Sequence, residues 1–133
     1  MASILKVDEL QGITAAGDIT VTSEGGAATM QLQQALCKHW NNVDQTGFTL
    51  ADSFNTSSVT DNGTGDTNPN FTNNMNNDDY AVSLSCGDSG ARYFGDIVLR
   101  SAVTTSTYRS YWSNGTSPND MDVATSTVHG DLA

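Results

Sequence analysis

Apolar and polar residues alternate along much of the second half of the chain, a pattern typical of β-strands with one buried face. The alternating runs cover residues 80–86, 93–103, 108–112 and 121–129. The run over 93–103 is apolar on both faces over much of its length, so we expect it at the centre of a sheet or at a subunit contact. Strands at this spacing predict an all-β fold. We interpret it as an antiparallel β-sandwich of the jelly-roll kind, with a barrel as the alternative.

A β-hairpin is expected around Asp61-Asn62-Gly63, which separates two extended runs. The tight turn that matches strand twist needs positive φ at both central residues, which Asn tolerates and Gly adopts freely. Asn114-Gly115 indicates a second turn of this kind. Pro69 lacks a backbone N–H, so residues 67–72 are predicted to form an edge strand or a broken strand.

The first 40 residues follow a different pattern. Residues 27–40 are the one helix candidate, because they contain mostly good helix formers and place Leu32 and Leu36 on one face over about three turns. We therefore expect an extended N-terminal arm over residues 1–26, a short helical neck over 27–40 and a β-sandwich head over 41–133. A strand pair folded back on the head and a surface helix are the alternatives for the first two segments.

The apolar side chains of the expected arm are too few to form a core of their own. They need another surface to pack against, and backbone pairing with a partner sheet would suit an extended segment of this kind. The candidate docking residues are Ile4, Leu5, Val7, Ile19 and Val21.

Composition supports one β-rich domain with a thin core. The chain has 133 residues, of which 37% are hydrophobic and 8% aromatic, while Thr, Ser, Asn, Asp and Gly are abundant. These residue types favour strands joined by many turns over long helices. A core of this size suits strands with one solvent-facing side, or burial between subunits.

The formal net charge of −10, with five Lys and Arg in total, argues against a nucleic-acid partner because phosphate backbones repel such a surface. No stretch approaches the roughly 20 apolar residues that a membrane span needs, so we expect no membrane insertion. Residues 1–7 lack the apolar run of a signal peptide, which predicts synthesis and folding in a cytoplasm.

The residues with metal or redox chemistry do not form a recognisable site. His39 and His129 have no cysteine pair nearby at zinc-ligand spacing, and the aspartates in the turns do not match a calcium-binding loop. Cys37 and Cys86 are too few for a disulfide framework, and whether they pair stays open, with buried free thiols favoured. We expect no metal ion and no cofactor.

Gly87-Asp88-Ser89-Gly90 matches the centre of the trypsin-like nucleophile motif, and His39 precedes it in the chain. The residues flanking both positions differ from that family, and 133 residues are too few for its two barrels. The tetrapeptide is therefore interpreted as a turn between strands, and we expect no catalytic residues and no enzymatic activity.

Several short segments together resemble a known family. Residues 54–66 (Phe-Asn-Thr-Ser-Ser-Val-Thr-Asp-Asn-Gly-Thr-Gly-Asp), 70–72 and 79–82, with the opening residues 1–8 and the ending 129–132, are similar to segments of tail-fibre and other virion structural proteins of marine tailed phages, including phages of cyanobacteria. The resemblance implies an all-β head, an N-terminal segment that docks on the particle, and a homo-oligomer, most often a trimer. It implies no enzymatic activity. Residues 67–70 depart from the family pattern, which continues with an apolar strand there.

These expectations lead to a fibre- or knob-like virion protein, assembled in the host cytoplasm, whose arm binds tail or capsid proteins and whose head contacts a host cell-surface glycan or protein. The alternative is a capsid decoration protein that stabilises the particle without binding a receptor. Aromatic and amide side chains suit contact surfaces. The candidate host-contact residues are Arg109, Tyr111, Trp112 and Asn114. Strand alternation offers another interpretation, in which Tyr108 and Trp112 face the core.

Overall fold

The computed structural model describes residues 4–13, 15, 19–23, 25–26, 28–88, 94–98 and 102–133. The protein is an all-β chain of antiparallel sheets with one short helix, which confirms the predicted fold class. It divides into two compact units, Met1–Leu36 and Cys37–Ala133, and each is described by itself.

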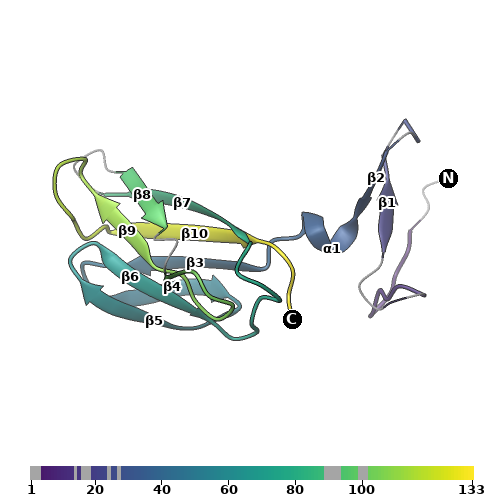
Figure 1. Ribbon diagram of the computed structural model, residues 1–133, viewed down its shortest axis with the longest axis horizontal. Coiled ribbons are helices and arrows are strands. Elements are labelled where there is room, and N and C mark those ends of the chain that lie inside the picture. The colour runs from purple at the N-terminus through teal and green to yellow at the C-terminus, as the bar shows by residue number, and fades with distance from the viewer. Residues whose placement is uncertain are drawn as a thin grey trace. The chain divides into compact units, whose positions relative to one another are not determined.

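The first unit contains a two-stranded hairpin and one turn of helix (Figure 1). Strand β1 (Thr20–Thr22) pairs antiparallel with β2 (Thr29–Gln31), and α1 (Leu32–Ala35) follows directly. Every residue of both strands is exposed, and α1 buries none of its residues. The described part of this unit therefore has no hydrophobic core within its strands and helix.

The helix is much shorter than the three turns expected over residues 27–40. It has four residues, and Gln31 at its N-cap makes no side-chain capping bond. The physical reason for the difference is that a short helix without caps or a buried face is marginal in water. The end of the expected neck instead joins the head, because Trp40 is the second residue of a strand there.

The head consists of two four-stranded antiparallel sheets that face one another (Figure 1). One sheet has the order β4-β3-β10-β7 and the other the order β5-β6-β9-β8. The strands are β3 (His39–Asp44), β4 (Thr49–Phe54), β5 (Thr56–Gly63), β6 (Asp66–Phe71), β7 (Ala81–Gly87), β8 (Phe94–Val98), β9 (Ser110–Ser113) and β10 (Val123–His129). This sandwich-like arrangement is the one predicted from the alternating runs.

The core of the head lies between the two sheets in two clusters. Inward-facing side chains alternate with outward-facing ones along β3, β6, β9 and β10, as a sandwich requires. One cluster contains Phe71, Met75, Tyr80, Tyr108 and Val128, and the other contains Val43, Trp112, Met121 and Ala124.

The predicted hairpin is present, but its turn lies two residues later than expected. Asn62 and Gly63 are the last residues of β5, and the chain reverses at Thr64 and Gly65. Tertiary bonds hold the reversal there, because Gly65 N–H donates to Asp120 Oδ1 (2.7 Å) and Gly65 O accepts from Trp112 N–H (2.8 Å).

Pro69 lies within a strand in the interior of its sheet. Strand β6 lies between β5 and β9 and runs unbroken from Asp66 to Phe71, so the expectations of an edge strand and of a broken strand are both wrong. The β6–β9 ladder covers Asp66 and Thr67, and beyond it Thr107 Oγ1 donates to the Pro69 carbonyl (2.7 Å). A side chain thus replaces the backbone ladder at the proline.

The run over residues 93–103 was expected to be central, and this is wrong. Strand β8 is at the end of its sheet, and among the described residues its one hydrogen-bonded neighbour is β9. Residues 93 and 99–101 of the run lie outside the described residues. A subunit contact at this strand stays a prediction.

Candidate functional site

The candidate contact residues Arg109 and Tyr111 lie on the outer face of the β5-β6-β9-β8 sheet. They alternate with Tyr108, Ser110 and Trp112, which are at most 2% exposed. The prediction that Trp112 contacts a host is therefore wrong, and the alternative that alternation turns it into the core is correct. The physical reason is the period of two along a strand, which places Trp112 on the same side as Tyr108.

Arg109 is fixed by two neighbours on this face. Its Nε donates to Asp66 Oδ1 (2.8 Å) and its Nη2 to Asp66 Oδ2 (2.5 Å), which is a bidentate ion pair. The hydrogen bond from Arg109 lowers the pKa of Asp66, and the same bond raises the pKa of Arg109. The guanidinium carbon also lies 5.2 Å from the centroid of the Tyr111 ring, a cation–π distance.

Amide side chains continue this network across β6 to β5. Asn70 Nδ2 donates to Ser58 Oγ (3.1 Å) and to Thr60 Oγ1 (3.2 Å). Asn62 Nδ2 donates to Asn68 Oδ1 and to an Asp66 carboxylate oxygen. We define the polar face as Ser58, Thr60, Asn62, Asp66, Asn68, Asn70, Arg109 and Tyr111. It is an array of hydroxyl, amide and carboxylate groups held in place by one another.

The amide members of the polar face were not predicted as contact residues. In the sequence, Asp66, Asn68 and Asn70 alternate with buried Thr67, Pro69 and Phe71. This period of two was the signal available, and Pro69 obscured it because proline argues against an interior strand.

Asn114 acts in a turn. Its Oδ1 accepts from Thr116 N–H (3.0 Å) and Ser117 N–H (2.9 Å), and Gly115 has a φ of 86°. A turn is confirmed at the predicted place, although only Gly115 of the Asn-Gly pair has a positive φ. Because its side-chain oxygen accepts hydrogen bonds within the turn, Asn114 has a structural role. A contact with a host would be left to its side-chain NH2 group.

Four of the five candidate docking residues are exposed. The exposed fractions are 77% for Ile4, 79% for Leu5, 54% for Val7 and 38% for Val21. Ile19 is half-buried, and its carbonyl accepts from Leu32 N–H (2.7 Å). Four further large apolar side chains of this unit that were not predicted as docking residues are also exposed: Leu10, Ile13, Met30 and Leu36.

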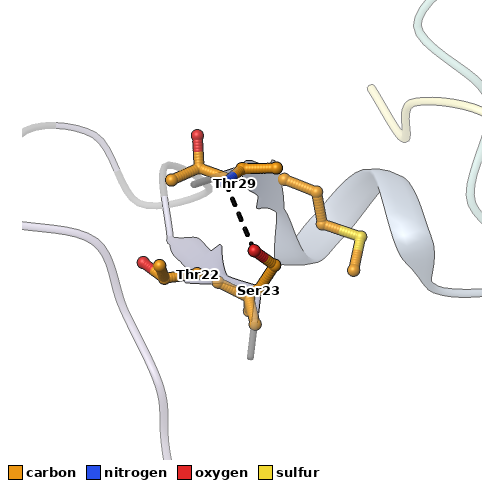
Figure 2. Close-up of a pocket in the computed structure, with 6 residues that line it drawn as sticks. Thr22, Ser23 and Thr29 are labelled. Atoms are coloured by element: carbon orange, nitrogen blue, oxygen red, sulfur yellow. Dashed lines mark hydrogen bonds between the residues drawn. The ribbon is translucent and has the colours of Figure 1, made fainter. Parts of the chain in front are cut away.

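A shallow hollow lies beside the β1–β2 hairpin (Figure 2). It is lined by Val21, Thr22, Ser23, Ala28, Thr29 and Met30. Ser23 Oγ accepts from Ala28 N–H (3.2 Å) and helps to close the hairpin. Its volume of about 140 Å³ is well below the roughly 300–1,000 Å³ of a small-molecule pocket. The hollow is therefore too small for a typical small-molecule ligand.

In the described part of the chain, His39 and the two cysteines of the head have structural roles. His39 is fully buried, its Nε2 lies 3.0 Å from Thr56 Oγ1, and its ring packs edge-on against Phe71. Cys37 and Cys86 are free, and the Cys37 thiol donates to the His39 carbonyl (2.9 Å). Cys37 and Cys86 are therefore not paired with one another.

The remaining motifs add no chemistry among the described residues. No group of three or more His, Cys, Asp or Glu side chains is placed to hold a metal ion within that part of the chain. Ser89 and Gly90 of the nucleophile-like motif lie outside the described residues. Across the described ranges, no helix is long and apolar enough to cross a membrane.

The fold and the site define an antiparallel β-sandwich head with a self-bonded polar face, preceded by a unit with exposed apolar side chains. Comparisons with protein-family models, curated proteins and solved structures find no match.

Proposed function

We propose that this chain is a structural protein of a phage virion, fibre- or knob-like, which docks on the particle by its N-terminal unit and exposes its β head for attachment to a host surface. The observation that carries the proposal is the contrast between the two units. The head closes two hydrophobic clusters, whereas the first unit exposes seven large apolar side chains by half or more: Ile4, Leu5, Val7, Leu10, Ile13, Met30 and Leu36.

An unburied apolar segment of this length needs a partner. A two-stranded hairpin is marginal by itself in water, and burying one Leu, Ile or Val side chain contributes about 1.5–3 kcal/mol. Docking Ile4, Leu5 and Val7 on a tail or capsid protein therefore supplies several kcal/mol, which neither α1 nor the β1–β2 hairpin supplies within the chain.

The proposed assembly is a homotrimer, as the family resemblance implies. Light scattering of the purified full chain is expected to give about three times 14.0 kDa. A mass of 14.0 kDa for a clean monomer would contradict the trimer, and the particle would then be what organises the protein.

A capsid decoration protein without a receptor is the second candidate. The observation in its favour is that the polar face is bonded within itself, with Arg109 held by Asp66 and Asn70 held by Ser58 and Thr60. Such a face is stable in water without a ligand. Decoration predicts many copies per particle and unchanged adsorption when the head is removed, whereas attachment predicts loss of adsorption.

Deleting residues 1–20 is expected to leave a folded oligomer that no longer joins the particle. The head keeps its core because none of its cluster residues lies in the deleted segment. The measurement is the amount of protein that co-sediments with particles, with thermal unfolding as the check on folding.

A triple replacement of Ile4, Leu5 and Val7 by serine should reproduce the loss, because it removes apolar area and leaves the length of the chain unchanged. The matched control replaces the neighbouring Asp8 and Glu9 by serine and is expected to incorporate normally. If the deleted chain still incorporates at the normal level, the N-terminal unit is not the docking element.

A further inference from the structure

The outer face of the β4-β3-β10-β7 sheet carries an aromatic pair beside a row of polar side chains. Trp40 of β3 lies directly opposite Phe54 of β4 and opposite Thr127 of β10. Residues opposite one another in a ladder have their side chains on the same face. Trp40 is half-buried, and Phe54 is 51% exposed although it is a large apolar residue.

The next row of this face is polar. Asn42 lies opposite Asp52 on one side and Thr125 on the other. Ser53 N–H donates to Asp52 Oδ1 (2.8 Å), which holds the carboxylate in place. Beyond these strands, β7 adds Ser83 and Ser85, so that the face continues with small hydroxyl side chains. We call Trp40, Asn42, Asp52 and Phe54, with Thr125 and Thr127, the aromatic face.

Charge limits what this face binds. None of the four strands of the sheet contains Lys or Arg, and Asp44 and Asp52 are its acidic residues. The whole chain has a formal net charge of −10. An anionic ligand would be repelled, and a second copy of this face would bring like charges together.

We propose that the aromatic face is a binding site for a neutral glycan. The apolar C–H side of a hexose ring packs on an aromatic ring, while its hydroxyl groups need donors and acceptors at the rim of that ring. Trp40 and Phe54 supply the aromatic surface. Asp52 and Asn42, one row away, supply the hydrogen-bond acceptors and donors. This inference deepens the proposed function and rests on it for its setting, since it names the host-surface chemistry that the head would meet.

The test is affinity electrophoresis of the full chain in native gels that contain dextran, soluble starch, laminarin or galactomannan, with heparin as the anionic comparison. We expect retardation in at least one neutral gel and none in heparin. Trp40→Ala and, separately, Asp52→Ala are expected to raise the dissociation constant at least tenfold. Asp52 lies on an exposed strand, so its variant keeps the test valid if Trp40→Ala does not fold.

Phe48→Ala, which removes a 39% exposed aromatic ring from the turn between β3 and β4 and lies outside the aromatic face, is the matched control and is expected to bind as the unmodified chain does. Absence of retardation in all four neutral gels would overturn the inference. So would retardation of the Trp40 and Asp52 variants as strong as that of the unmodified chain. So would an oligomer that dissociates in the Trp40 variant without any glycan binding, because the face would then be a contact between copies. These failures leave the particle-incorporation test untouched, so a failed glycan site and a failed virion role are distinguishable.

Discussion

Replacing Gly65 by alanine is expected to lower the free energy of unfolding of the head by about 2–5 kcal/mol. Gly65 has a φ of +65°, a conformation that costs an L-residue about 1–2 kcal/mol. A Cβ at this position would lie 2.4 Å from Trp112 O and 2.7 Å from Asn119 N, both backbone atoms of the chain packed behind the turn. Backbone cannot move aside as a flexible side chain does, and overpacking adds about 1–3 kcal/mol.

Gly63→Ala is the matched control, because it lies two residues away in the same hairpin. Gly63 also has a positive φ of +125°, but nothing lies within 4 Å of a Cβ built there. It should lose only the backbone part, about 1–3 kcal/mol, because an L-residue is strained at this φ as well. Urea unfolding monitored by Trp fluorescence measures both variants. Equal losses for the two alanines would mean that the contacts of Gly65 with the 112 and 119 backbone do not hold the turn.

The hairpin shows what local sequence can and cannot predict. Alternation and the Asn-Gly signal predicted two paired strands correctly, because both are local properties. The position of the turn depends on the bonds from Gly65 to Asp120 and Trp112, residues about 50 positions further along the chain. Turn chemistry near Asn62 could not predict these tertiary contacts, so the turn was expected two residues early.

The candidate site, too, could be predicted from local sequence only in part. Alternation along β9 was enough to separate outward Arg109 and Tyr111 from buried Trp112, and that interpretation was available from the sequence. The sequence did not predict the Arg109–Asp66 pair or the Trp40–Phe54 pair, because each pair depends on the register between separate strands. The length of the helix was predicted wrongly for a different reason, since helix propensity over residues 27–40 was not supported by a buried face, and the helix covers only Leu32–Ala35.

Lowering the pH from 7 to 4.5 is expected to reduce the free energy of unfolding of the head by about 2 kcal/mol through one residue, His39. Burial against Phe71 and Tyr108 lowers the pKa of His39 from 6.5 to about 4. Between these two values the unfolded chain binds a proton that the folded head does not, so stability falls as the pH falls through this window. The full shift corresponds to about 3 kcal/mol.

Replacing His39 by glutamine is expected to flatten this part of the pH profile, whatever it does to stability at pH 7, because glutamine does not titrate. The readout is therefore the slope of the unfolding free energy against pH. His129→Gln, at an exposed position of β10, is the control and should keep the slope. The hydrogen bond from Arg109 lowers the pKa of Asp66 below its ordinary value near 3.8. The stability that this ion pair contributes is therefore lost at a lower pH than the His39 window between about 4 and 6.5. A His39→Gln profile as steep as that of the unmodified chain would show that the protons are taken up elsewhere, and that the buried imidazole does not control the acid sensitivity of the head.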